Sequence, residues 1–208
     1  MKLWSSSIGN GAPIDGAFAF AIQSPQGHIA LSHNRNPHLA WSEAPAGTRS
    51  FVLLCHDPDV PSHGDDVNKE DRTVPADLPR VDFFHWVLID IPPDVNEIAE
   101  GSMSDCITPR GKPGGSNEFM RQGINDYTGW FAGDPQMAGD YHGYDGPCPP
   151  WNDERPHRYI FTLYALSIAH LPLSGRFDGH QVRQAIAAHT ISEASIFGRY
   201  TLNPSVAL

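Results

Sequence analysis

The 208-residue sequence lacks most of the features that would assign it to a specialised class of protein. Its three cysteines are an odd number at irregular spacing, so they encode neither a disulfide framework nor a zinc-binding CxxC pair. No run approaches the roughly 18 apolar residues of a membrane-spanning helix. The sequence also contains no internal repeat and no long apolar stretch of the kind found in secretory signals, so we expect a cytoplasmic protein.

Positive charge is scarce as well. The chain has 14 Lys and Arg against 24 Asp and Glu, which gives a formal net charge of −10. A net-acidic protein repels the phosphates of nucleic acids and of anionic membranes. We therefore expect no nucleic-acid partner and no transmembrane segment. A small anion held in a local pocket remains compatible with this charge.

Turn-forming residues, in contrast, are abundant. The sequence contains 19 Gly and 19 Pro, with 40% hydrophobic and 18% charged residues. This composition excludes a disordered chain and indicates many turns, as in an all-β domain. A chain of this length is large enough for a full core, so we predict one domain over residues 1–208.

The hydrophobic pattern predicts a mainly β fold, with an antiparallel two-sheet β-sandwich-like core and a few peripheral helices. Aromatic and β-branched runs predict strands at residues 17–22, 51–55, 83–91, 158–166 and 197–202. One helix is predicted over about 179–195, with Asp178 as its N-cap and Gln181 completing a capping box.

Two polar or glycine-rich stretches, residues 62–82 and 110–142, are predicted to be loop insertions on the domain. Trp130 and Phe131 are the strongest core candidates in the second stretch. Because predicted strands flank it, we expect an excursion of one domain and not a linker between two.

Polar side chains gather where three of the predicted strands begin or end. Asp57 and Asp59 follow the first of these strands, His85 begins the second, and His157 and Tyr159 begin the third. Residues two apart on a strand share a face, so His157 and Tyr159 are expected to lie together. Three strand ends with such residues predict one small polar pocket.

The same alternation makes predictions for the neighbouring residues. His85 is expected to share its face with Val87, Ile89 and Ile91, whereas Arg158 points away from the pocket. The stretch from Gly146 to Pro150 is rich in proline and predicts a rigid pocket wall whose backbone N–H groups can donate to a ligand.

Each of these pieces alone has an ordinary structural explanation. An Asp-Pro-Asp sequence is usually only a turn, and a single His at the start of a strand is more often structural than functional. The occurrence of all of them together, each at a strand end, is what favours a site.

In this combination the sequence resembles the phosphatidylethanolamine-binding protein family, and more narrowly its bacterial Raf-kinase-inhibitor-like branch. The resemblance is carried by residues 57–61 (DPDVP), 85–87 (HWV), 146–150 (GPCPP) and 157–159 (HRY). Weaker similarities occur at residues 36–41 (NPHLAW), 45–48 (PAGT) and 189–194 (HTISEA).

The resemblance implies two antiparallel sheets and a pocket for a phosphate-like or carboxylate group, such as a phosphoethanolamine head group. The binding residues that it implies are Asp57, Asp59, His85, Gly146, Cys148, Pro149, His157 and Tyr159. It implies a binding protein with no catalytic residues and no cofactor, with a regulatory role toward a kinase or protease.

A pocket with two aspartates and two neutral histidines would repel an anion, so we expect affinity to rise as the pH falls into the histidine range. In this view the histidines and Tyr159 donate to the anion, while Asp57 and Asp59 orient the histidines.

Three alternatives stay open at this point. The His and Asp residues could hold a metal ion in a hydrolase, although no HExxH motif occurs. Cys148 could be a reactive thiol, although no GxSxG-type elbow is present. The chain could also be a protein-interaction module with an idle pocket, and neither a protein partner nor a homodimer can be identified from the sequence.

Overall fold

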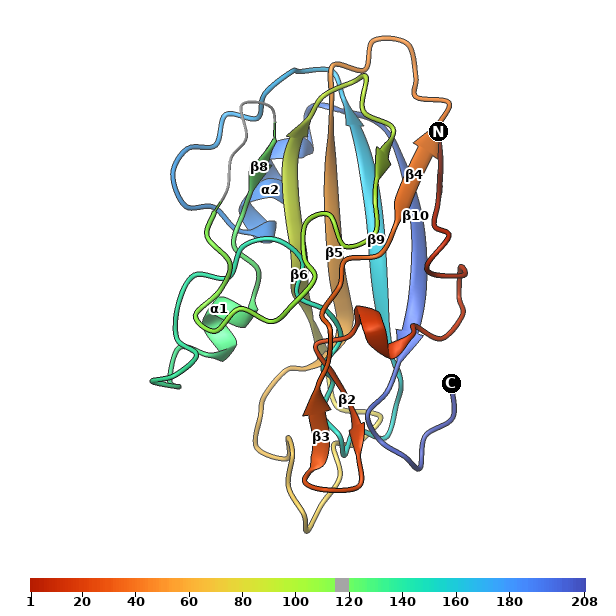
Figure 1. The fold of residues 1–208 in the computed structure, drawn as a ribbon. Coiled ribbons are helices and arrows are strands. Elements are labelled where there is room, and N and C mark those ends of the chain that lie inside the picture. Colours follow the sequence, from red (N-terminus) through yellow and green to blue (C-terminus); the bar gives the residue numbers. More distant parts are fainter. Residues whose placement is uncertain (115–119) are drawn as a thin grey trace.

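The computed structural model describes residues 1–114 and 120–208, and strands dominate it (Figure 1). The large strands are β5 (Ser50–Pro61), β6 (Arg80–Ile91), β9 (His157–Leu166) and β10 (Thr190–Tyr200). The shorter ones are β1 (Lys2–Trp4), β2 (Ala21–Ser24), β3 (His28–Leu31), β4 (Leu39–Ser42), β7 (Glu97–Ile98) and β8 (Arg121–Gln122). Two short helices, α1 (Tyr127–Trp130) and α2 (Gly179–Ile186), accompany them.

The strands form antiparallel sheets. A five-stranded sheet has the order β10-β9-β5-β6-β8, a three-stranded sheet the order β1-β4-β7, and β2 and β3 form a hairpin. All pairings within these sheets are antiparallel. The predicted fold class, mainly β with antiparallel sheets and a helix near the C-terminus, is thereby confirmed.

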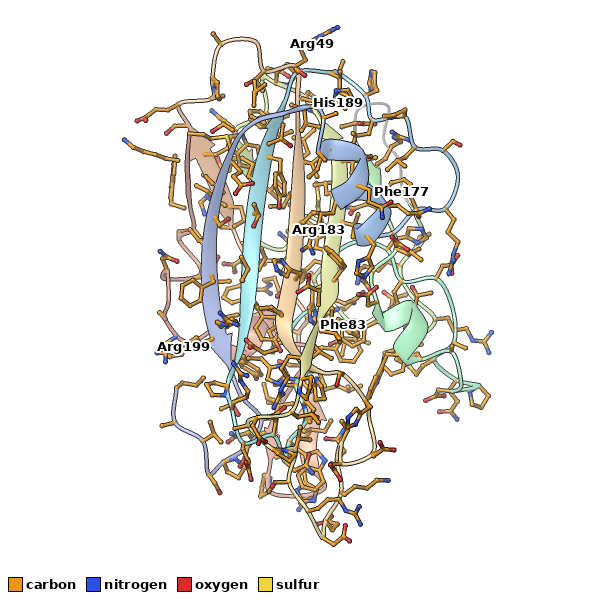
Figure 2. All side chains as sticks on the ribbon, turned by 180° about the vertical axis from the view of Figure 1, so that it is seen from behind. Arg49, Phe83, Phe177, Arg183, His189 and Arg199 are labelled. Carbon is orange, nitrogen blue, oxygen red and sulfur yellow. The ribbon has the colours of Figure 1, made fainter. Side chains whose placement is uncertain are left out.

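The five-stranded sheet buries apolar side chains on both faces. On one face, Phe51 and Trp86 pack in one cluster with Trp41 of the three-stranded sheet. On the other face, Phe84 packs in a second cluster with Val182 of α2. Figure 2 shows α2 lying across this second face from behind. Because strand side chains alternate between faces, this central sheet needs apolar residues in both registers.

The predicted helix is correct at its beginning and wrong at its end. Asp178 accepts from the Gln181 N–H and Gln181 reaches back to the Asp178 N–H, which is the expected capping box. The helix ends at Ile186, and the residues from Thr190 onward form β10, which pairs with β9 along its whole length. Long-range pairing of a β-branched and serine-rich segment overrides its helical periodicity.

Two further expectations need correction. Residues 17–22 do not form one strand, because Asp15 caps a short 3-10 helix at Gly16–Phe18 and β2 begins only at Ala21. Trp130 is not a core residue, since its relative exposure is 56%, whereas Tyr127 and Tyr141 are buried nearby.

The loop between β5 and β6 is shorter than the predicted 62–82 segment and is not wholly exposed. β6 already begins at Arg80, and Val74 is fully buried. Within the 110–142 segment, residues 115–119 lie outside the described part of the chain; whether the two segments are insertions stays a prediction. Over the described residues, no helix is both long and apolar enough to cross a membrane.

Candidate functional site

The ends of β5, β6 and β9 meet the β2–β3 hairpin and α1 in one region of the fold (Figure 1). A cavity of about 360 Å³ is lined by residues of these elements. Six of the eight predicted site residues line it, namely Asp57, His85, Cys148, Pro149, His157 and Tyr159. Asp59 and Gly146 do not. We call the four buried residues Asp57, His85, His157 and Tyr159 the polar floor of this cavity.

A β-bulge directs His85 into the cavity. Cys55 of β5 pairs with Trp86 of β6, and the next residue of β5, His56, pairs with Phe84. His85 is therefore an extra residue of β6 that has no pairing partner in β5. Its ring then lies 5.0 Å from that of Tyr159 (centroid to centroid). The extra residue puts His85 on the same side as Trp86, not with Val87 and Ile89 as predicted.

The hydrogen bonds of His85 fix its proton. Its Nδ1 lies 2.7 Å from the carbonyl oxygen of Asp145, which can only accept, so Nδ1 carries the hydrogen. Burial lowers the pKa of His85 to about 4, so at neutral pH the ring is uncharged and Nε2 is an acceptor. No hydrogen bond among the described residues occupies that Nε2.

His157 is the opposite case. Nδ1 lies 2.7 Å from Asp57 Oδ2, and Nε2 lies 3.0 Å from Asp153 Oδ2. Both nitrogens must donate to satisfy two carboxylates, so the ring is an imidazolium. Burial opposes this charge, but Asp57 and Asp153 outweigh it and raise the pKa of His157 to about 9. Arg80 completes the chain by binding Asp153 with two nitrogens.

Asp59 points away from the floor and pairs with arginines, not with a histidine as predicted. Arg158 donates from Nε (2.8 Å) and from its backbone N–H (3.0 Å), and Arg155 lies 3.0 Å away. Burial works against the Asp59 charge, but Arg158 outweighs it and holds the pKa of Asp59 below its usual value. A register shift between Asp57 and Val60 separates the two aspartates, so they face different partners although they are two residues apart.

The loop around Gly146 is tied to the rest of the fold by hydrogen bonds, and its first amide is not free for a ligand. The Gly146 N–H donates to Asn34 Oδ1, and its carbonyl accepts from the Tyr127 hydroxyl. A Cβ at this position would lie 2.1 Å from the Phe18 carbonyl oxygen, so only glycine fits. Gly146 therefore holds the cavity wall in place and lies behind it.

Within the polar floor, the hydroxyl of Tyr159 is the one donor that lacks a hydrogen-bond acceptor. Three buried polar side-chain atoms in the described part of the chain lack a hydrogen-bond partner, and only Tyr159 among their residues lines the cavity. Burial and then the nearby Asp57 charge raise the pKa of this phenol well above its usual value, and the Asp57 carboxylate adds a weak polar contact that falls outside hydrogen-bond distance and geometry, so the proton stays on the oxygen. An unpaired buried hydroxyl costs about 1–3 kcal/mol, which a ligand oxygen could recover.

Neither of the catalytic alternatives finds support in this geometry. Burial raises the pKa of the Cys148 thiol to about 12, so it is not an activated thiolate. Over the part of the chain that is described, no three His, Cys, Asp or Glu side chains are grouped so that they could hold a metal ion.

Several lining residues were not predicted from the sequence. Phe20, Tyr127 and Phe131 form a ring stack on one wall, with centroids of Phe20 and Tyr127 4.7 Å apart and of Tyr127 and Phe131 5.6 Å apart. They come from distant segments, so no local pattern unites them. A signal did exist for Asn68 and Val67, because the 62–82 stretch was expected to be a loop and follows closely on Asp57 and Asp59 in the sequence.

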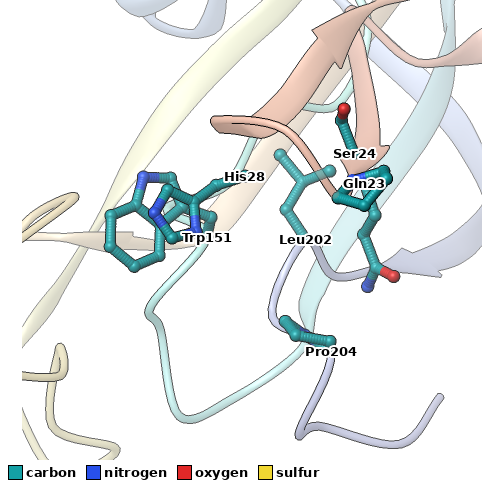
Figure 3. A pocket seen from close by; sticks show the side chains of 7 residues that line it. Gln23, Ser24, His28, Trp151, Leu202 and Pro204 are labelled. Atoms are coloured by element: carbon teal, nitrogen blue, oxygen red, sulfur yellow. The ribbon is translucent and has the colours of Figure 1, made fainter. Parts of the chain in front are cut away.

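A second hollow of about 380 Å³ lies between the β2–β3 hairpin and the C-terminal segment (Figure 3). Its walls include His28 and Trp151, whose rings stack with centroids 3.7 Å apart. None of the predicted site residues lines it.

Comparison with known proteins agrees with the fold. Residues 4–201 match the family described as phosphatidylethanolamine-binding protein. The chain belongs to this family. The members of the phosphatidylethanolamine-binding protein family are mostly non-catalytic binding proteins.

The similar members include bacterial UPF0098 proteins. YbhB of Escherichia coli is 28% identical over 202 residues, covering 97% of this chain and 100% of that protein. A UPF0098 protein of Aquifex aeolicus is 30% identical, covering 96% of this chain and 88% of that protein. The crystal structure of E. coli YbcL, described as a new member of the mammalian PEBP family, superposes with a TM-score of 0.69 at 24% identity, covering 96% of this chain and 97% of YbcL. The chain thus lies in the YbhB/YbcL-like branch of the family.

Proposed function

We propose that this protein binds a small ligand through an acidic head group, phosphate-like or carboxylate, and releases it unchanged. The observation that carries the proposal is the buried Tyr159 hydroxyl, which has no partner among the described residues and lies beside His85 at the base of the cavity. A phosphate or carboxylate oxygen is a strong acceptor for such a donor.

The charge of the floor is compatible with an anion. Asp57 is paired with the His157 cation, and Asp59 is paired with Arg158 outside the cavity. The repulsion expected from two free aspartates is therefore largely compensated before any ligand enters. This leaves His85 and Tyr159 as the groups that meet the head group.

The proton of the complex follows from the His85 tautomer. Nε2 is an acceptor at neutral pH, so either the ligand brings a P–OH group or His85 takes up a proton on binding. A phosphate ester has a second pKa of about 6, so at higher pH it is a dianion without a proton. In both cases, therefore, binding of the dianion requires the uptake of one proton by the complex. Affinity should therefore decrease about tenfold per pH unit between about pH 7 and about pH 8.5.

Isothermal titration calorimetry with phosphoethanolamine tests the proposal. We expect saturable binding to the wild type, the pH dependence given above, and an affinity about tenfold or more weaker for Tyr159→Phe, because one hydrogen bond to a charged group is lost. Thermal unfolding of Tyr159→Phe should show little or no loss of stability, since the deleted hydroxyl has only the nearby Asp57 carboxylate and no partner at hydrogen-bond distance and geometry.

Tyr144→Phe is the matched control. Its hydroxyl is equally buried but donates to the Phe18 carbonyl, away from the cavity. This variant should lose stability, on the order of 1 kcal/mol, and keep its affinity. Equal affinities of wild type and Tyr159→Phe, or no binding of phosphoethanolamine at any pH, would overturn the proposal. The second result would leave regulation of a kinase or protease through protein contacts as the remaining proposal.

A further inference from the structure

Over its described residues the cavity is lined by no lysine and no arginine, although the proposed ligand is an anion. Its floor instead begins a row of four buried side chains whose charges alternate in sign. In order from the cavity they are Asp57, His157, Asp153 and Arg80, joined by contacts of 2.7, 3.0 and 2.5 Å. We call these four side chains the charge row. Each is at most 7% exposed, so salt and water screen their charges only weakly.

Arg80, at the far end of the charge row, is held where it cannot touch a ligand. Its guanidinium has five N–H donors, and all five are used. Two of them donate to Asp153. The other three donate to backbone carbonyls at 2.8–3.1 Å, namely those of Asp59, Pro75 and Leu78. Arg80 does not line the cavity, so its charge can affect a ligand only through the row.

The sum of the charges in the row decides what an anion at the floor experiences. Two carboxylates and two cations cancel, whereas without Arg80 the row would carry one net negative charge. A charge of this kind repels an anion strongly because the row is buried. Other carboxylates near the floor have cations of their own and do not depend on Arg80. Asp145 binds Lys112, and Asp59 binds Arg158.

We infer that Arg80 is a positioning residue of the binding site, which sets the charge of the floor from outside the cavity through Asp153 and His157. This inference rests on the proposed function, because it explains how a floor that contains an aspartate accepts an anion. Neither Arg80 nor Asp153 lies in the sequence segments that carry the family resemblance. The site thus selects the charge of its ligand with a residue that the ligand does not contact.

Variants that change the sum of the row test the inference. Methyl phosphate is titrated calorimetrically at about pH 6.5 and about 0.1 M salt, which screens distant surface charges but not buried neighbours. Arg80→Gln makes the row more negative and should weaken binding on the order of tenfold. Asp153→Asn makes the row more positive, because His157 keeps its contact with Asp57, and should strengthen binding a few-fold. Arg80→Gln/Asp153→Asn restores the sum and should bind as the wild type does.

Arg121→Gln is the matched control. Arg121 also binds a buried aspartate, Asp90, and two backbone carbonyls, those of Leu171 and Leu173. None of these residues lines the cavity. This variant lowers the net charge of the protein by the same amount as Arg80→Gln. Because the change lies outside the row, affinity should stay within about twofold of the wild type.

The pattern across the variants separates charge from structural damage. A merely structural role would weaken binding in both single variants and most of all in the double variant, which would overturn the inference and leave the acid site in place. Equal affinities of Arg80→Gln and Arg121→Gln would overturn it too. If Arg80→Gln does not fold, Asp153→Asn still decides, because damage cannot produce the expected gain. If the wild type binds no methyl phosphate, the proposed function itself fails.

Discussion

At the scale of the residue, the buried His157 cation is the feature that organises the site. It lies between Asp57 and Asp153, with no exposure to solvent, and each of its ring nitrogens donates to a carboxylate. A buried ion pair contributes to stability only when its hydrogen bonds are complete, as they are here. Removing the histidine would leave two buried carboxylates facing each other.

The raised pKa of His157 makes stability depend on pH. Its folded-state pKa is about 9, against about 6.5 in an unfolded chain, so its stabilisation is complete below about pH 6.5 and is lost as the pH rises through about 9. The loss is on the order of 3 kcal/mol. Urea unfolding of the wild type at several pH values should show this decline.

His157→Gln should be less stable than the wild type at about pH 6 and should lack the decline toward about pH 9. His170→Gln serves as the control, because the His170 side chain is 73% exposed. Parallel pH profiles for wild type and His157→Gln would show that the histidine is neutral in the folded protein.

The residues of the floor were largely predictable, and their partners were not. Spacing and residue type identified Asp57, His85, His157 and Tyr159 as candidates for one pocket, which is where they lie. The pairing of Asp59 with Arg158 depends on a register shift in β5. The Gly146 amide is occupied by Asn34, which lies more than 100 positions away in the sequence. Such contacts leave no local pattern in the sequence, because they form only after the chain has folded.

At the scale of the element, the loop between β5 and β6 depends on one asparagine. Asn152 is 5% exposed and makes hydrogen bonds to four backbone groups between Asp66 and Arg72. Asn152→Ala should therefore loosen this loop, with faster amide hydrogen exchange over residues 66–74, and should weaken binding of phosphate esters because Val67 and Asn68 line the cavity.

Asn36→Ala is a close match for comparison. Asn36 is also buried and binds backbone groups of Pro37, Ala99, Met103 and Ser104, at a loop that does not line the cavity. In the Asn36→Ala variant, amide hydrogen exchange should become faster near residues 99–104, and the affinity for phosphate esters should be unchanged. If both variants weakened binding equally, the effect would be one of general stability and not of the cavity wall.

Element boundaries illustrate where the sequence misleads. The capping box at Asp178 and Gln181 is a local interaction, and the beginning of α2 was predicted correctly from it. The end was not, because the pairing of β10 with β9 decides it, and β9 lies more than 20 residues earlier. The mainly β fold itself could be predicted, since it follows from composition and from long β-branched runs.

At the scale of the whole molecule, net charge opposes the proposed ligand. A chain with a formal charge of −10 repels an approaching anion, and salt screens this repulsion. Affinity for methyl phosphate should accordingly rise a few-fold between about 0.02 and about 0.3 M salt, whereas zwitterionic phosphoethanolamine should respond less.

Titration at several ionic strengths measures this effect. A decrease of affinity with salt would mean that positively charged groups near the opening dominate the local field, contrary to what the overall charge predicts.

The extra residue at His85 has a consequence for how this family can vary. A strand tolerates exchanges of side chains, but one deletion or insertion in β6 between Phe84 and Trp86 would turn the histidine out of the cavity or displace the buried Trp86. A relative could thus retain every motif of the site and still have lost the pocket. The number of residues in β6, as well as their identity, therefore decides whether a histidine at this position faces the cavity.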